Sequence, residues 1–315
     1  MLTWIAAALI ASPALAADCD AKALKKELAD ASLVEGFGSG AVHLLDLVRR
    51  FVRRRAPAGA LALAEQRHAD WFVQLARTAR PAHLPDLVVA CRRARAAGRP
   101  GVAVGCAIGA WKVLEAQGPP ELAVELLQPL LDHVYGPERP ELVAALSSAL
   151  GACGRLQEGL DWLDRELADD PDPAVRALYL ERRGGRLFDL GRLPEARSCL
   201  EEAVSLYQQL SDARGEADSV GVLGVVLHRC GDVDAAEACY KTAIRLQDAV
   251  GNTTRKAASL TNLGSLRLEQ GDRRARGLLE EAVRSIGTLT SILPWGPYRR
   301  TMMSFVKQIP LKPDL

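Results

Sequence analysis

The sequence predicts an all-α protein, an α-solenoid of antiparallel helical hairpins. Hydrophobic residues make up 49% of the chain, aromatic residues only 5% and charged residues 25%, a composition that suits packed amphipathic helices better than sheets. The 315 residues exceed the usual size of one compact domain, so we expect two units or one extended array. Glycines that recur at a fixed step in the second half of the chain favour the array.

The first seventeen residues, MLTWIAAALIASPALAA, have the pattern of a secretory signal peptide. A short apolar run is followed by Pro13 and by an Ala-Leu-Ala sequence that ends at Ala16, as at a cleavage site. The run is too short to span a bilayer, so we expect no transmembrane segment. It lacks the preceding Lys or Arg of a standard signal. We expect a periplasmic or secreted protein; in the alternative, residues 1–17 are an ordinary apolar helix of a cytoplasmic protein.

Charge is distributed unevenly along the chain, although the net charge is only +1. Residues 41–100 hold twelve Arg against four acidic residues, whereas residues 101–290 hold 21 basic against 29 acidic residues. The densest basic run extends from Arg49 to Arg55 and lacks the interleaved aromatic residues on which bases stack. We therefore expect a solvated helix face there, or a contact with a protein or a phosphate, and no nucleic-acid partner.

Neither the cysteines nor the histidines form a pattern that indicates catalysis or metal binding. The five histidines are dispersed, and no G-x-S-x-G, H-E-x-x-H or G-x-x-x-x-G-K-[ST] motif occurs. The seven cysteines form no C-x-x-C pair and suit small buried positions on helices: Cys19, Cys91, Cys106, Cys153, Cys199, Cys230 and Cys239. We expect a protein that is not an enzyme and has no catalytic residue, metal or cofactor.

Small residues recur with a step of forty residues in the second half of the chain. Two series of glycines lie seven residues apart: Gly184, Gly224 and Gly264, then Gly191, Gly231 and Gly271. Alanines follow the second series by five and twelve residues, at Ala196 and Ala203 and at Ala236 and Ala243. In the third copy the spacing is one residue shorter, at Ala275 and Ala282.

Such residues allow two antiparallel helices to approach closely, because one helix presents no side chain where the other presents a methyl group. We expect Ala236 to fill the space that Gly224 leaves. The second glycine of each copy should end the first helix in the left-handed conformation, with Asp232 or Asp272 capping the next helix. Leucines and a tyrosine supply the bulk between layers: Leu180, Leu223, Leu263, Leu200 and Tyr240.

This pattern resembles the tetratricopeptide repeat, in which helix A carries a Leu-Gly pair, a Gly-Asp turn follows, and helix B carries two spaced alanines. The resemblance covers residues 175–287, and its period of forty is similar to the longer variety found in bacterial signalling proteins. No proline closes helix B, so we expect that helix to run on through residues 205–219. Upstream, Trp111 and Ser147 stand in place of the first glycine in two degenerate copies.

Residues 23–80 carry a second resemblance, to the winged-helix segment that joins the nucleotide-binding domain to the repeats in bacterial signalling ATPases of the STAND class. The similar stretches are ELADASLV (27–34), HLLDLVRRFV (43–52) and RHADWF (67–72). Between them, GFGSGA (36–41) superficially fits a dinucleotide-binding loop, but its flanks read as two strands of a wing, so we expect a hairpin turn. The ATPase motif is missing, so the resemblance implies no ATP hydrolysis here.

These observations predict five segments along the chain. They are a signal peptide (1–17), a winged-helix-like remnant with a linking helix (23–80), degenerate helical hairpins (85–170), tetratricopeptide-like repeats (171–290) and a C-terminal tail (291–315). The oligomeric state is left open.

The resemblance implies an interaction module, a scaffold or adaptor that binds a peptide or protein partner on the concave surface of a superhelix. The alternative is a regulatory sensor arm that acts with a separate signalling ATPase or kinase in the cytoplasm. In tetratricopeptide proteins the ligand-facing positions lie on helix A. In this sequence they are Glu181, Phe188, Asp189, Val225, His228, Arg229, Thr261, Asn262, Ser265 and Glu269.

Overall fold

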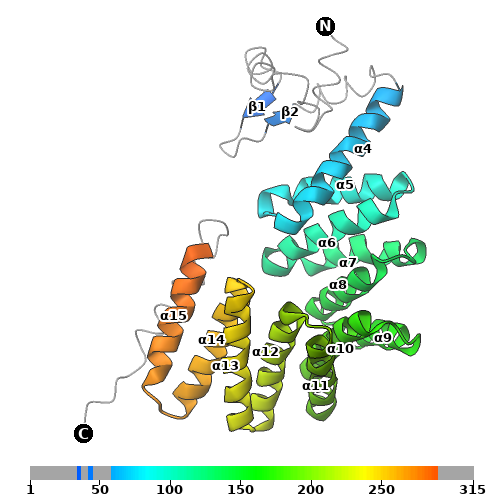
Figure 1. The fold of residues 1–315 in the computed structure, drawn as a ribbon. Coiled ribbons are helices and arrows are strands. Elements are labelled where there is room, and N and C mark those ends of the chain that lie inside the picture. Colours follow the sequence, from blue (N-terminus) through cyan, green and yellow to red (C-terminus); the bar gives the residue numbers. More distant parts are fainter. Residues whose placement is uncertain (1–33, 37–41, 45–57, 290–315) are drawn as a thin grey trace. The chain divides into compact units, whose positions relative to one another are not determined.

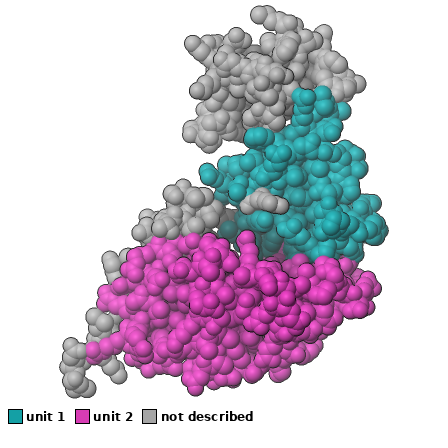
Figure 2. All heavy atoms as spheres, in the orientation of Figure 1, with its two compact units in different colours: residues 1–145 teal, residues 146–315 magenta. Residues whose placement is uncertain are grey.

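The computed structural model describes residues 34–36, 42–44 and 58–289 (Figure 1). The chain forms two compact units, residues 1–145 and residues 146–315, and the division falls within helix α8 (Arg139–Ala152) (Figure 2). The predicted solenoid of antiparallel helical hairpins is confirmed. The boundaries of the five segments expected from the sequence stay a prediction.

A short antiparallel hairpin precedes the helices of the first unit. Strand β1 (Val34–Gly36) pairs with strand β2 (Val42–Leu44), with Val34 opposite Leu44. This pairing agrees with the two strands expected on either side of GFGSGA. The winged-helix remnant is not confirmed, because residues 23–33 and 45–57 lie outside the described residues, as does the turn itself.

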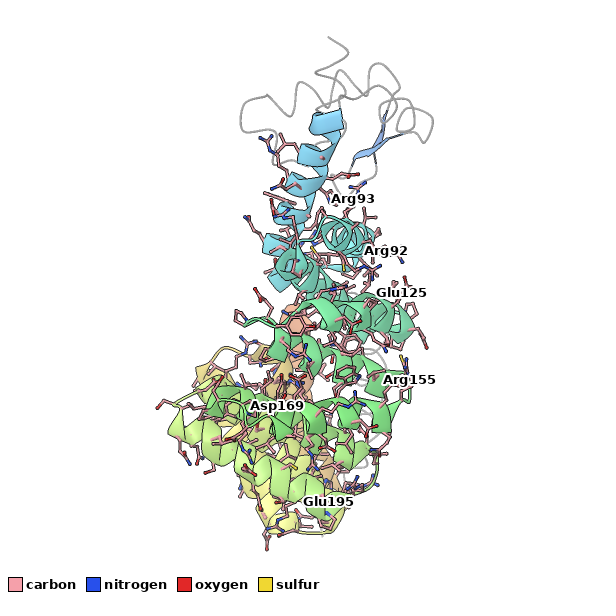
Figure 3. The ribbon with its side chains drawn as sticks, turned by 90° about the vertical axis from the view of Figure 1, so that its right-hand side faces the viewer. Arg92, Arg93, Glu125, Arg155, Asp169 and Glu195 are labelled. Carbon is pink, nitrogen blue, oxygen red and sulfur yellow. The ribbon has the colours of Figure 1, made fainter. Side chains whose placement is uncertain are left out.

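The first unit continues with helices α4 (Ala58–Leu75), α5 (Leu84–Ala96), α6 (Pro100–Gln117) and α7 (Pro120–Leu127), with 3-10 turns at Ala76–Thr78, Pro81–His83 and Gln128–His133. Helices α6 and α7 each begin at a proline, whose missing N–H costs nothing at a first helical position. Gly109 lets α6 approach the turn after α4: a β-carbon there would lie 2.6 Å from Cβ of Ala76. On the outside, Arg92 of α5 pairs with Glu125 of α7 at 2.7 Å (Figure 3).

The second unit is a row of helices, each packed against the next along the chain (Figure 1). After the end of α8 come α9 (Leu156–Ala168), α10 (Pro173–Asp189), α11 (Leu193–Gln209), α12 (Ala213–Cys230), α13 (Val233–Ala249), α14 (Thr253–Glu269) and α15 (Arg274–Leu289). Helices α10, α12 and α14 are helix A of successive repeats, and α11, α13 and α15 are helix B. The six framework alanines are all buried, at 0–1% exposure.

The turns inside the hairpins follow the predicted glycine chemistry. Gly191, Gly231 and Gly271 have φ values of 75°, 83° and 72°, in the left-handed region where glycine lacks the steric penalty of other residues. Asp272 caps the helix that follows it, since its Oδ1 accepts a hydrogen bond from the N–H of Arg274 at 2.9 Å. Asp232 occupies the cap position of α13, but its side chain makes no capping hydrogen bond.

The expectation that helix B runs on through residues 205–219 is wrong. Helix α11 ends at Gln209, and Ser211 takes the left-handed conformation with φ 56°. Asp212 then caps α12, because its Oδ1 accepts hydrogen bonds from the N–H groups of Arg214 and Gly215 at 3.0 Å each. Helix B therefore ends without a proline: Ser211 makes the left-handed turn, and Asp212 caps the helix that follows.

The expectation that Ala236 fills the space beside Gly224 is also wrong. A β-carbon on Gly224 would lie 2.8 Å from two ring carbons of Tyr240. The equivalent glycines face the equivalent residues: a β-carbon on Gly184 would lie 2.6 Å from Cγ of Leu200, and a β-carbon on Gly264 would lie 2.7 Å from Cδ2 of Leu279. The buried alanines instead let the backbones of helices A and B come close, while one large side chain per repeat covers the glycine.

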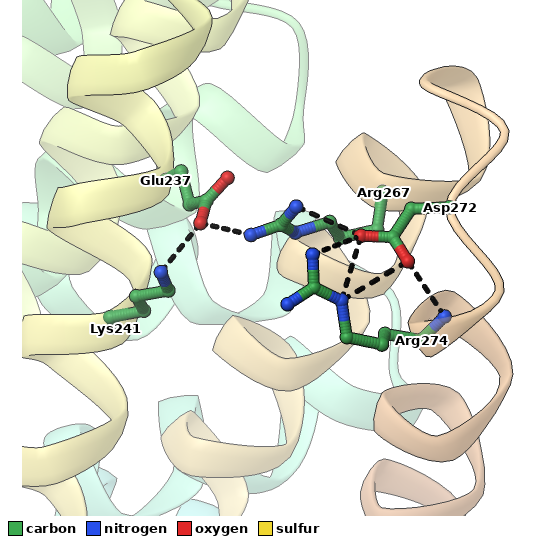
Figure 4. A network of polar contacts seen from close by, with 5 residues as sticks. All are labelled: Glu237, Lys241, Arg267, Asp272 and Arg274. Carbon is green, nitrogen blue, oxygen red and sulfur yellow. Dashed lines mark hydrogen bonds and ion pairs between the residues drawn. The ribbon is translucent and has the colours of Figure 1, made fainter.

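A polar network crosses the last repeat at a position where the earlier repeats are apolar (Figure 4). Arg267 stands where Leu227 and Leu187 are buried, forty and eighty residues earlier. Its guanidinium donates to Glu237 of α13 and, at 2.9 Å, to Asp272 in the turn. Lys241 also pairs with Glu237, at 2.5 Å, and Arg274 also donates to Asp272. The network joins α13, α14 and the start of α15.

Candidate partner-binding surface

The three A helices lie side by side within the second unit. Helices α10 and α12 contact each other, and so do α12 and α14, whereas α11 and α13, or α13 and α15, make less contact between their described residues. The solvent-facing sides of α10, α12 and α14 are called here the A surface.

The structure places nine of the ten predicted partner-binding residues where they are at least partly exposed. Asp189, Arg229 and Glu269 are exposed, and the half-buried ones are Phe188, Val225, His228, Thr261, Asn262 and Ser265. Glu181 is buried, with 8% exposure. The hydroxyl of Thr261 is already used, since it donates to the carbonyl of Ala257 at 2.9 Å.

His228 and Glu269 meet across two A helices near their C-terminal ends. Nε2 of His228 lies 3.0 Å from Oε2 of Glu269, although the residues are 41 positions apart in sequence. The imidazole also lies edge-on to the ring of Tyr240, with centroids 6.5 Å apart. On α10, Asp189 pairs with Arg186 at 3.0 Å. This end of the A surface carries charges of both signs beside the half-buried Phe188.

Glu181 is buried beside α11 and is not part of the exposed A surface. The hydroxyl of Tyr207 on α11 donates to its carboxylate at 3.3 Å, and Arg182 lies 3.8 Å away. Burial raises the pKa of Glu181 above its usual range, while Arg182 opposes the shift. Burial, together with the adjacent carboxylate, also raises the pKa of Tyr207. The pair holds α10 and α11 together through a buried hydrogen bond.

A second polar cluster on the A surface was missed from the sequence. Asp218 on α12 pairs with Arg255 on α14 at 3.8 Å and accepts a hydrogen bond from Asn252 at 3.5 Å. Asp218 stands seven residues before Val225 and therefore on the same helical face. A prediction that followed the face of Val225 two turns further toward the N-terminus of helix A would have included Asp218.

Cys91 on α5 and Cys106 on α6 are buried thiols of the first unit. Burial raises the pKa of Cys91 to about 11 and that of Cys106 to about 12, so both stay protonated at neutral pH. Within residues 58–289 and the two strands, no group of three or more His, Cys, Asp or Glu side chains is arranged to hold a metal ion. In the same residues no helix is both long and apolar enough to cross a membrane.

Comparisons with known proteins agree with the geometry of the hairpins. The STAND protein (signal transduction ATPase with numerous domains) from Pyrococcus horikoshii, which has a tetratricopeptide repeat sensor, is 13% identical with a TM-score of 0.53. The similarity covers 98% of this chain and 53% of that one, so this chain spans about half the length of that protein. At this identity the likeness concerns the fold alone.

Two further solved structures have lower TM-scores. BtubC (BKLC) from P. vanneervenii is 15% identical with a TM-score of 0.48, over 74% of this chain and 93% of that chain. The TPR-like repeats of a putative kinesin light chain from Podosopora anserina are 19% identical with a TM-score of 0.44, over 67% and 98%. No curated protein sequence matches the chain.

The family model of the tetratricopeptide repeat matches residues 175–248 and 219–285. These ranges extend from α10 to α15, the helices that carry the framework glycines and alanines and the left-handed turns. Residues 175–285 of this chain are therefore tetratricopeptide repeats.

Proposed function

We propose that the A surface binds an extended segment of a protein partner and that the protein is a non-enzymatic scaffold or adaptor. Tetratricopeptide repeats are protein-interaction modules, and this class of protein generally works without catalysis. The observation that carries the proposal is that the A helices α10, α12 and α14 contact one another in succession, so that their exposed residues lie on neighbouring helices. A repeat array of this kind offers an extended surface that a peptide can follow.

The chemistry of the A surface suits a partner of mixed character. Half-buried apolar side chains, Phe188 and Val225, alternate with the charged groups of Asp189, Arg229 and Glu269. Apolar contacts supply area removed from water, and the polar groups select orientation. Since both signs of charge occur, the surface favours neither a strongly acidic nor a strongly basic partner.

The triple change His228→Ala, Arg229→Ala and Glu269→Ala tests the proposal. It removes the partly exposed His228–Glu269 pair, but a surface pair of this kind contributes only about 0–1 kcal/mol, so the melting curve should move little. Partner recovery in affinity capture from the native host, quantified by mass spectrometry, should fall. A matched triple variant on helix B, with Glu201→Ala, Glu202→Ala and Arg197→Ala on α11, should leave partner capture unchanged. Equal capture by the wild type and the A-surface triple would contradict the proposal.

A second candidate function is a sensor arm that acts with a separate signalling ATPase or kinase in the cytoplasm. The observation that favours it is the fold likeness to the STAND protein of Pyrococcus horikoshii over 98% of this chain. Such a partner would be a nucleotide-binding protein, and its capture should respond to ATP and Mg²⁺. Capture of a partner without a nucleotide-binding domain, from an exported fraction, would favour the scaffold instead.

A further inference from the structure

The loop between the 3-10 turn at Gln128–His133 and helix α8 presents an aromatic ring to the solvent. Tyr135 is 81% exposed, the largest exposed fraction among the large apolar side chains that the structure describes. It belongs to the first unit, whereas the A surface lies on the second. Single exposed aromatic side chains are common on protein surfaces, so its significance depends on how the loop holds the ring and on what surrounds it.

Hydrogen bonds fix both the ring and the loop that carries it. The hydroxyl of Tyr135 donates to the carbonyl of Asp132 at 2.9 Å. Nη1 of Arg139 donates to the carbonyls of Leu131 at 3.0 Å and Val134 at 2.8 Å. The guanidinium of Arg139 also lies over the ring of Tyr135, 5.8 Å from its centroid. The exposed ring therefore loses little conformational freedom when a partner binds, a property that favours a binding anchor.

The charged side chains of the loop are acidic. Residues 132–138 include two carboxylates, Asp132 and Glu138, and no Lys or Arg. Both side chains are exposed, and neither forms an ion pair with another described residue. Glu138 folds back beside the residue that follows Tyr135, since its Oε2 lies 3.1 Å from the place of a β-carbon on Gly136. The two carboxylates outnumber the guanidinium of Arg139, so the surroundings of the exposed ring are negative.

We propose that Asp132, Tyr135 and Glu138, called here the Tyr135 site, bind an arginine side chain in a basic segment of a protein partner. Arg139 covers one face of the ring, and the other face is open to solvent. A guanidinium stacks flat on an aromatic face and at the same time donates hydrogen bonds to carboxylates beside it. The Tyr135 site would be a second place of contact, in a different unit from the A surface.

The charges of the Tyr135 site disfavour other occupants. Proteins that stack the bases of single-stranded nucleic acids combine aromatic side chains with basic ones that hold the phosphates, whereas Asp132 and Glu138 would repel a phosphate. A purely apolar partner would bury the two carboxylates without a counter-charge, which is unfavourable. An arginine side chain uses the ring and the carboxylates together.

The probe for the test is the peptide acetyl-GRGRGRG-amide, titrated into the full-length protein labelled with ¹⁵N. Its control carries citrulline in place of each arginine, which keeps the planar shape but has no charge. The arginine peptide should shift the backbone signals of Tyr135 and Gly136 in a saturable way, and added salt should weaken its binding because the charges involved are exposed. The citrulline peptide should give no saturable shift. Equal shifts with both peptides would overturn the proposal.

Two substitutions of Tyr135 separate the ring from its hydroxyl. Tyr135→Phe keeps the aromatic face and should retain most of the affinity for the arginine peptide. Tyr135→Leu removes that face and should weaken binding roughly two- to fivefold, as expected for an exposed cation–π contact. Because the side chain is exposed, the melting temperature should change little in either variant. Wild-type affinity in Tyr135→Leu, or equal losses in both variants, would reject the ring as the binding group.

Glu138→Gln tests the carboxylates, with Glu115→Gln as the matched control. Glu115 is also exposed but lies near the C-terminal end of α6, whereas Oε1 of Glu138 lies 3.2 Å from the place of a β-carbon on Gly101, at the N-terminal end. Both variants change the net charge equally. Glu138→Gln should weaken binding of the arginine peptide roughly two- to fivefold and Glu115→Gln should not. Equal effects of the two variants, or loss of peptide binding in the A-surface triple, would overturn the Tyr135 site.

Discussion

Gly224 on α12 lies directly against the ring of Tyr240 on α13. A β-carbon on Gly224 would lie 2.8 Å from Cδ1 and Cε1 of Tyr240, closer than two carbon atoms can approach. The ring is 1% exposed and belongs to the hydrophobic core, so it is enclosed by other side chains. The cost of a glycine within a helix is thus offset by the burial of one large side chain in each repeat.

Gly224→Leu should force helices A and B of the second repeat apart. Overpacking of this kind costs roughly 1–3 kcal/mol of unfolding free energy, and the melting temperature should fall accordingly. Because each repeat rests mainly on its neighbours, hydrogen exchange should speed up first in the adjacent hairpins and last in the first unit. Thermal melting and exchange mass spectrometry measure both effects.

A pair of neighbouring glycines provides the control for this prediction. Gly184→Ala would place a β-carbon 2.6 Å from Cγ of Leu200, whereas a β-carbon on Gly185 meets nothing within 4 Å. The first change should lower the melting temperature and the second should raise it. The same sign for both would contradict the close-approach explanation.

Ser211→Gly should stabilise the protein, because Ser211 holds a left-handed conformation with φ 56° in an exposed turn. The penalty for such a residue is roughly 1–2 kcal/mol, and glycine does not incur it. Gly251 occupies the same place in the next repeat with φ 69°, so Gly251→Ser should destabilise by a similar amount. Urea unfolding midpoints that move in the same direction for both variants would refute the argument.

The network around Arg267 should make stability depend on pH in the acid range. Hydrogen bonds from Arg274 hold the pKa of Asp272 at about 2, below its ordinary value of 3.8. A carboxylate whose pKa is lower in the folded state contributes stability above its ordinary pKa, and that contribution disappears as the pH falls toward 2. The melting temperature should therefore drop between about pH 4 and pH 2.

Asp272→Asn should lower the melting temperature at pH 7 and flatten this acid drop. Asp234→Asn, an exposed aspartate in the first turn of α13, provides the control and should leave the slope unchanged. If the wild type and Asp272→Asn lose stability in parallel below pH 4, the network does not contribute as proposed.

Export with cleavage after Ala16 or Ala17 follows from the SPALAAD junction, which lies outside the described residues. Expression in the native host should give a mature chain that begins at Ala17 or Asp18 and is found outside the cytosol. Intact protein beginning at Met1, recovered only from the cytosolic fraction, would contradict the prediction. Mass spectrometry of the N-terminal peptide measures it.

Local chemistry explains what could be predicted about the hairpins. A left-handed turn favours glycine, as at Gly191, Gly231 and Gly271, and an amphipathic helix repeats its apolar residues with a period of 3.6, so both leave a recognisable mark within a few residues of sequence. The left-handed Ser211 leaves no such mark, because serine is common in turns and helices alike. The end of helix B was therefore mispredicted although its capping aspartate is only one residue away.

The sequence by itself determined the repeat, its period, the helices and the small residues at their contacts, because these depend on neighbours along the chain. Only the tertiary structure decided which side chain covers each glycine, that Glu181 is buried, and that His228 meets Glu269 and Asp218 meets Arg255. These pairs join residues some forty positions apart. Their contacts depend on how one repeat is rotated against the next, and side chains packed between helices set that rotation, which no local pattern encodes.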